Sequence, residues 1–206
     1  FTLDFDGSLG ARTEARADID LNIFNLVQVD GTFAFSRGSD TFKTDQSNAA
    51  TAFSADYLAI SIENVNAFIG VNGLGLDLQG VDLGVLVVSD AANAVNYTAI
   101  TGSLLTANLV GLDDLVPAAG VNNATFAINQ TSNTVDENAV LDFAGAGHDF
   151  TFSGTSLTLT MAATEGGLIE AQSWLNLSLF DLVTVNGTFA FKKDNDTFYL
   201  DAAGTS

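Results

Sequence analysis

One stretch of the sequence occurs twice, 156 residues apart. Residues 21–42 read LNIFNLVQVDGTFAFSRGSDTF, and residues 177–198 read LSLFDLVTVNGTFAFKKDNDTF. Thirteen of the 22 aligned positions are identical, and the alignment needs no gap. Similarity at a fixed internal period is typical of repeat architectures. We therefore expect one full period over residues 1–156 and the start of the next over 157–206.

Alternation of apolar and polar residues predicts β-strands along most of the chain. Ile19, Leu21 and Ile23, for example, alternate with aspartates and an asparagine, as in a strand with one buried and one solvated face. Lys, Glu and Arg, which usually coat a surface helix, are scarce. We therefore expect an all-β fold of long antiparallel strands and hairpins in an elongated repeat architecture, either solenoid-like or built of stacked sheets.

The repeated stretch contains Asp30-Gly31, a dipeptide that favours a two-residue hairpin turn. A strand that runs straight through instead keeps the apolar residues of 27–35 on one face. We therefore expect one long strand, with Gly31 at a point where another backbone or a ring packs closely. On this interpretation residues 24–26 form a bulge or corner, and residues 36–40 form a tight turn into a return strand.

A weaker sub-repeat divides the period into three hairpin-based units, at roughly residues 1–65, 66–109 and 110–156. Each unit contains Val followed by Asp or Asn, then an apolar strand, a polar loop and a second strand. Any antiparallel all-β protein also contains such similar segments by chance. A true sub-repeat and a chance similarity therefore both stay open. Within the second unit the apolar alternation changes phase at Gly80, which predicts a bulge there.

Charge excludes two classes of partner. The chain has 25 acidic and six basic residues, for a formal net charge of -19. A polyanion repels nucleic acid and anionic membrane surfaces, so we expect no nucleic-acid partner. Every apolar run of about 18 residues is interrupted by Asp, Asn or Gly, so no membrane insertion is expected. Cysteine is absent, which excludes disulfides and thiolate metal sites.

The sequence supplies few catalytic residues. His148 is the only histidine, and no GxSxG motif accompanies it, so we interpret it as an exposed loop residue. Asp18 and Asp20 both project from the polar face of a strand toward solvent. Asp4 and Asp6 align with uncharged residues of the second copy, which argues against an active site. We therefore expect no enzymatic activity.

A loop near the C-terminus offers the most credible metal chemistry. Asp194, Asn195 and Asp196 place two carboxylates and an amide in a short stretch, and calcium takes six to eight oxygen ligands in proteins. Two adjacent lysines precede these residues and oppose a cation, and the first copy of the repeat keeps only Asp40. We expect no cofactor, and we retain Asp194, Asn195 and Asp196 as candidate ligands of a structural calcium.

The motif LxLxLFxLVxVxGTFAF at residues 175–191, with its near-copy at 19–35, resembles long repeats of giant bacterial proteins. Those proteins are secreted or surface-attached and are often labelled adhesin-like. The resemblance implies an extracellular or cell-surface location in a bacterium, an elongated β-rich shape and a scaffolding or adhesive role. It implies no catalytic residues.

We therefore expect a structural repeat module of an extracellular fibre, sheath or giant surface protein. Its partners would be neighbouring copies of itself, on the same or another chain, and end-to-end stacking of β units would give length, rigidity or adhesion.

The alternative is a carbohydrate- or ice-binding β module, with a cell-surface glycan as a partner. Such a module needs a flat exposed array of aromatic side chains or a regular threonine ladder. Thr151, Thr158 and Thr160 are the candidate ladder, and Trp174 is the candidate exposed aromatic residue.

Overall fold

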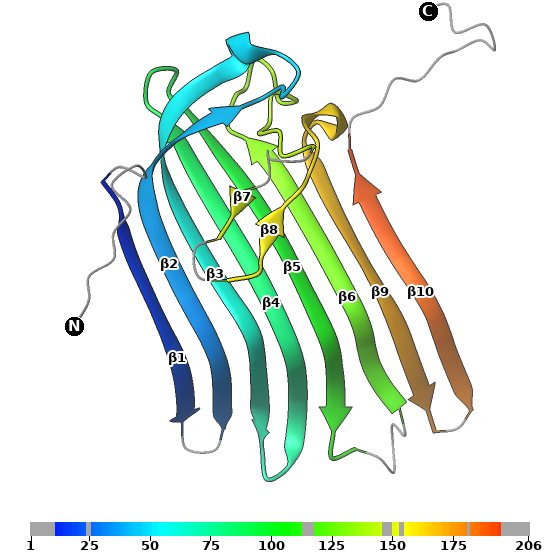
Figure 1. The fold of residues 1–206 in the computed structure, drawn as a ribbon. Helices are drawn as coiled ribbons and strands as arrows, with labels where there is room; N and C mark the ends of the chain where they lie inside the picture. Colours follow the sequence, from blue (N-terminus) through cyan, green and yellow to red (C-terminus); the bar gives the residue numbers. More distant parts are fainter. Residues whose placement is uncertain are drawn as a thin grey trace, which may run out of the picture.

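The structure is a computed structural model that describes residues 11–23, 26–112, 118–145, 150–152, 155–180 and 182–194. It contains an eight-stranded antiparallel sheet of order β1-β2-β3-β4-β5-β6-β9-β10 and a two-stranded sheet, β7-β8 (Figure 1). The strands are β1 (Thr13–Ile23), β2 (Val27–Lys43), β3 (Ala52–Val71), β4 (Leu74–Asp90), β5 (Val95–Val110), β6 (Ala118–Thr131), β7 (Phe150–Thr151), β8 (Thr158–Leu159), β9 (Leu168–Leu179) and β10 (Val183–Lys193).

The first six strands, β1 to β6, lie side by side in chain order, and the chain then leaves the sheet over residues 132–167, here called the insert. The insert contains β7, β8 and the 3-10 turn η3 (Ala163–Glu165), and the chain re-enters the sheet as β9 beside β6. Figure 1 shows the insert lying over one face at one end of the strands, here called the covered end. The all-β prediction is confirmed. The described strands form one open sheet with β1 and β10 at its edges, and the elongated repeat architecture stays a prediction.

Strand β2 is one continuous strand of 17 residues through Gly31, as predicted. It also continues through residues 36–40, where we expected a turn, because Ser36 pairs with Ala59 and the following residues pair onward along β3. The chain instead reverses between Ile23 and Leu26, where we expected a bulge or corner. Leu26 N donates a hydrogen bond to the Ile23 carbonyl at 2.8 Å, so β1 and β2 form a hairpin.

The phase change predicted at Gly80 is present. Gly80 has φ 60°, and positive φ also occurs at Asn64 in the neighbouring strand β3, with φ 51°, and at Asn123 in β6, two strands away, with φ 48°. The β3–β4 register shifts between Ile62 and Ala67. Glycine and asparagine tolerate positive φ better than other residues. The shift moves the alternation by one residue, so the apolar side chains of β4 stay on the same face on both sides of Gly80.

The hydrophobic core lies between the covered end of the sheet and the insert. Phe152 and Leu159 of the insert are 1% and 0% exposed, and they pack against the sheet residues Leu86 and Val88, both 0% exposed. A chain of ring contacts accompanies them, with Phe150 and Phe152 edge to face at a centroid distance of 5.5 Å. The buried cluster consists of Phe42, Ala55, Ala59, Leu86, Val88, Tyr97, Ala99, Leu141, Phe143, Phe152, Leu159, Met161 and Leu168.

Polar contacts of Asp142 hold the insert to the connection between β2 and β3. Its carboxylate accepts hydrogen bonds from the backbone N–H groups of Gln46 at 2.8 Å, Ala163 at 3.0 Å and Ala144 at 3.2 Å. Asp142 N in turn donates to the Lys43 carbonyl at 2.9 Å. The insert is therefore attached by backbone hydrogen bonds as well as by apolar packing.

Candidate interaction surfaces

The eight-stranded sheet has two unlike faces. The insert covers part of one of them, here called the insert face. The opposite face, here called the apolar face, carries four transverse rows of paired residues that run from β1 to β10. The rows are Ile23-Val27-Ile69-Leu76-Leu109-Ala119-Leu177-Val185, Leu21-Val29-Ala67-Leu78-Ala107-Val121-Leu175-Gly187, Ala17-Phe33-Ile62-Leu83-Gly102-Phe126-Ala171-Phe191 and Ala15-Phe35-Ile60-Val85-Ile100-Ile128-Ile169-Lys193. In the first row Leu109 and Ala119 are placed next to each other because they follow the last β5–β6 pair, Asn108 with Gly120.

Lys193 at the edge is the only charged side chain in these four rows. Nothing in the described part of the chain covers the apolar face, and its large side chains stay exposed, with Ile69 at 50%, Leu76 at 39% and Leu109 at 40%. The patch extends over all eight strands, whereas the largest apolar patch of an ordinary monomer covers a few hundred Å². An exposed apolar surface of this extent marks an interaction site.

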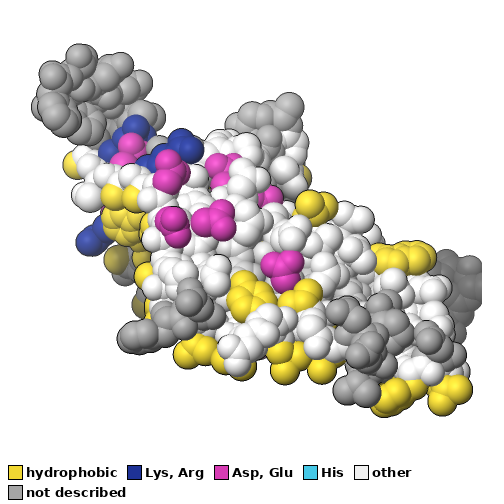
Figure 2. Space-filling view, turned by 90° about the horizontal axis from the view of Figure 1, so that it is seen from below, with side chains coloured by type: hydrophobic (Ala, Val, Ile, Leu, Met, Phe, Trp, Pro, Cys, Tyr) yellow, Lys and Arg dark blue, Asp and Glu magenta, His cyan; other side chains and the backbone are white. Residues whose placement is uncertain are grey.

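The insert face is largely polar where the insert leaves it uncovered. One row there consists of Asn22-Gln28-Phe68-Asp77-Asn108-Gly120-Asn176-Asn186. Acidic groups gather on this face, where Asp18 accepts a hydrogen bond from Thr32 at 2.7 Å and Asp82 accepts one from Ser103 at 3.2 Å. Figure 2 shows acidic side chains on one side of the sheet and hydrophobic side chains along the other.

The two copies of the sequence repeat form the same hairpin at opposite edges of the sheet. In the first copy Ile19 pairs with Gly31, and in the second Leu175 pairs with Gly187. The partners in every pair of the first hairpin differ from their counterparts by 156 residues, so the register is identical throughout. Sequence similarity therefore extends to backbone pairing.

Gly31 and Gly187 differ only in their surroundings. They have nearly the same backbone, with φ 156° and 159°. A Cβ on Gly31 would lie 2.5 Å from Val65 Cγ2 and 2.9 Å from Val65 Cα, because β3 packs closely there. The close approach predicted from the sequence is confirmed. A Cβ on Gly187 would meet no described atom within 4 Å, because no strand occupies the place beside β10 that β3 occupies beside β2.

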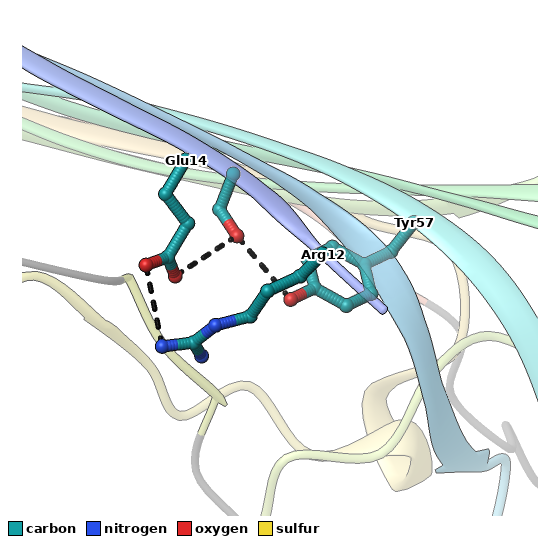
Figure 3. A network of polar contacts seen from close by, with 4 residues as sticks. Arg12, Glu14 and Tyr57 are labelled. Carbon is teal, nitrogen blue, oxygen red and sulfur yellow. Dashed lines mark hydrogen bonds and ion pairs between the residues drawn. The ribbon is translucent and has the colours of Figure 1, made fainter. Parts of the chain in front are cut away.

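A polar network ties β1, β2 and β3 together at the covered end (Figure 3). Arg12 pairs with Glu14 at 3.2 Å, and Ser36 Oγ donates to Glu14 at 3.5 Å and lies 3.3 Å from the Tyr57 hydroxyl.

In the second hairpin the positions of Glu14 and Ser36 are taken by Glu170 and Lys192, which also pair across the strands. Lys192 Nζ donates to Glu165 at 2.7 Å and lies 3.2 Å from Asp194. These two hydrogen bonds raise the pKa of Lys192 above its ordinary value.

The candidate calcium ligands are only partly placed. Asp194 is described, and its carboxylate lies beside the Lys192 ammonium. The chain therefore already places a positive charge beside this carboxylate. Asn195 and Asp196 lie outside the described residues, as do His148, Asp4 and Asp6. Among the described residues no three His, Cys, Asp or Glu side chains gather as metal ligands. A structural calcium in this loop stays a prediction.

A hollow of about 360 Å³ lies between the insert and the sheet. Its lining mixes hydroxyl groups, apolar side chains and two carboxylates, and it contains no histidine or cysteine among the residues that the structure describes. One of those carboxylates, Glu165, already binds Lys192. The lining side chains are Thr101, Ser103, Thr125, Leu157, Thr160, Met161, Glu165 and Glu170.

The threonines and the tryptophan that were candidates for carbohydrate or ice binding do not lie together in the structure. Thr151 and Thr158 face each other in the two-residue strands β7 and β8, with their hydroxyl oxygens 3.4 Å apart. Thr160 lies beyond the end of β8 and lines the hollow under the insert. Trp174 is 45% exposed on the insert face, paired with Asn122 and Thr188. The three threonines therefore form no regular ladder.

No protein-family model, curated protein or solved structure matches this chain. Among the described residues no helix is long and apolar enough to span a membrane. Sequence reasoning identified the repeated stretch and the close packing at Gly31, but it placed the turn at residues 36–40 instead of between β1 and β2, and it missed the continuous apolar face. The alternation of apolar residues in the sequence already indicated an apolar face. It did not show that no described segment of the chain packs on that face.

Proposed function

We propose that the chain is a structural repeat module of an extracellular fibre, sheath or giant surface protein of a bacterium. In this proposal copies of the module add to one another along the edges of the sheet, and the growing sheet gives length and rigidity. The module performs no catalysis and binds no cofactor. The extracellular location rests on the resemblance of the repeated motif to long repeats of surface-attached bacterial proteins.

The observation that carries the proposal is the contrast between Gly31 and Gly187. Val65 explains the glycine at position 31, because any side chain there would overlap it. The backbone itself favours glycine at both positions, with φ 156° and 159°, but at position 187 no described atom takes the place of Val65. A strand equivalent to β3, carrying a residue in the place of Val65, would supply that neighbour if it paired with the edge of β10.

The other edge supports the same arrangement. β9 pairs with β6 on the side away from β10, and β1 is the counterpart of β9 in the first copy. The free edge of β1 is therefore suited to a strand equivalent to β6. A sheet extended at both edges in this way adds six strands for each period, or about 29 Å at the usual strand spacing. Growth is by edge pairing, which replaces the end-to-end stacking that the sequence predicts.

A tandem protein tests this proposal. Residues 1–156 are placed before residues 1–206, and amide hydrogen exchange is compared with that of the single chain. We expect the outward N–H groups of β1 to exchange rapidly in the single chain, and those of β1 in the second copy of the tandem to become protected by β6 of the first copy. Small-angle scattering should show a longer particle. A compact particle with unprotected junction amides would contradict the proposal.

Trp174 favours a second function, recognition of a carbohydrate. Its ring is 45% exposed, and Asn122 and Thr188 flank it on the polar insert face, an arrangement that combines a stacking surface with hydrogen-bonding groups. Titration with glycan fragments should quench or shift the fluorescence of this single tryptophan. Unchanged fluorescence across a glycan panel would exclude Trp174 as the recognition residue.

A further inference from the structure

We propose that the apolar face is an interface between two copies of this sheet, stacked face to face around a two-fold axis. This contact differs from the edge pairing proposed above, because it uses side chains on one face rather than backbone groups at the edges. It therefore stands or falls independently of the proposed function. The resulting arrangement is a two-layer sandwich with the four apolar rows of each copy inside.

The area of the face is sufficient for a stable contact. Eight strands at the usual spacing are about 34 Å wide, and the shortest of them, β1 and β10 with 11 residues each, are about 36 Å long. The face therefore covers about 1,200 Å², whereas a stable interface of ordinary size buries about 800 Å² on each partner. A two-fold contact buries the same patch on both copies, so no second complementary surface is needed.

The apolar face has ridges and grooves that suit face-to-face packing of two sheets. The row that contains Ala67 and Ala107 is built largely of small residues, and the row beside it contains Ile69, Leu76 and Leu109. A further hollow on this face is bounded by Phe126 and Phe191 with the small Ala171 at its floor. Sheets that pack about 10 Å apart bury such ridges in the grooves of the opposite layer.

The distribution of charge favours a second copy over a lipid surface. The chain carries a net charge of -19, which opposes any association of two copies, but Asp18, Asp77 and Asp82 lie on the insert face. Stacking through the apolar face turns the acidic groups of the two copies away from each other. Their separation then exceeds the Debye length of about 8 Å at physiological ionic strength, so salt screens their repulsion. On an anionic lipid surface only one sheet, rather than two, would separate these acidic groups from the opposing charge, so salt would screen the repulsion less.

Neighbouring residues of β5 provide a matched test. Leu109 lies on the apolar face, in the row with Leu76, whereas Asn108 lies on the insert face, paired with Asp77. Leu109→Lys and Asn108→Lys therefore add the same charge one residue apart, on opposite faces. Circular dichroism and urea unfolding of both variants establish that the strands and the core are intact.

Sedimentation velocity of the full chain then gives the mass as a function of concentration. We expect the 21.4 kDa chain to form a dimer, and Leu109→Lys to raise its dissociation constant by about tenfold or more, because a buried unpaired ammonium is costly. Asn108→Lys should dimerise as the wild type does.

Three outcomes would overturn the proposal. One is a wild-type chain that stays monomeric at high micromolar concentration. Another is a dimer that Leu109→Lys leaves unchanged, which assigns the contact to the edges. A third is a monomer that floats with vesicles of zwitterionic phosphatidylcholine, with floating lost in Leu109→Lys, which assigns the face to lipid.

Discussion

The ring of Phe152 lies directly over Gly84, so that a Cβ on this glycine would be only 2.6 Å from Phe152 Cε2. Phe152 is the largest side chain that the structure buries completely. It reaches the sheet because β4 has no side chain at this position. The docking of the insert therefore depends on a glycine that lies near the middle of a strand, where glycine is otherwise unfavourable.

Gly84→Ala should lower the free energy of unfolding by about 1–3 kcal/mol, because the added methyl group overlaps the Phe152 ring. Without that overlap the same change in a strand would stabilise by about 0.5–1 kcal/mol. Urea unfolding measures the difference. In a Phe152→Ala background the alanine at position 84 should become neutral or stabilising, and purely additive effects of the two changes would contradict this account.

Gly31→Ala and Gly187→Ala form a matched pair. The two positions share φ values of 156° and 159°, so the backbone cost of an alanine is common to both. Only Gly31 faces Val65, and we expect Gly31→Ala to be the more destabilising change by about 1–3 kcal/mol in chemical denaturation of the single chain. Equal effects would mean that the contact with Val65 is not what requires a glycine.

Asp142→Asn should destabilise the attachment of the insert by about 1–3 kcal/mol, because an amide presents a donor to backbone N–H groups that need an acceptor. The carboxylate accepts from Gln46, Ala144 and Ala163. Asp136→Asn is the control, since among the described residues the Asp136 carboxylate accepts one hydrogen bond, from Asn138 N in the same exposed loop. The control should change stability by less than about 0.5 kcal/mol in thermal and urea unfolding. Equal losses would rule out a special contribution of Asp142.

Tyr97 should make the fold sensitive to alkaline pH. Burial, and secondarily the Asp90 carboxylate, raise the pKa of Tyr97 above its ordinary value near 10. The folded state holds the phenol proton more tightly than the unfolded state, so this contribution to stability is complete below about pH 10 and is lost as pH rises through the raised pKa.

Tyr97→Phe keeps the ring contact with Phe53, at a centroid distance of 5.4 Å, and removes the ionisable group. We expect urea midpoints of the wild type to fall more steeply than those of the variant above about pH 10. Parallel curves would show that Tyr97 ionises equally in both states.

The sequence predicted the all-β class and the continuous strand through Gly31 well. Alternation with a period of two reports directly which face a side chain takes, and the phase change at Gly80 was visible for the same reason. The close approach at Gly31 was also predictable, since glycine in an apolar strand indicates a neighbour at short range.

The turns were harder to place. Residues 36–40 read as a turn because they contain glycine, serine and aspartate, yet β2 continues through them because it pairs with β3 there. Pairing with a distant strand overrides local turn preference. Docking of the insert could not be predicted either, since it depends on contacts between residues as far apart as Gln46 and Asp142.

Six antiparallel steps lead from β1 to β9 in the sheet order, and because this number is even the two strands run in the same direction. In the assembly that we propose, each successive module would therefore present its insert at the same margin of the sheet. An odd count would have alternated the inserts between the two margins. The two margins of the fibre would therefore differ. The inserts would thicken and cover one margin, and the other would carry only the connections between strands, which would be available for attachment.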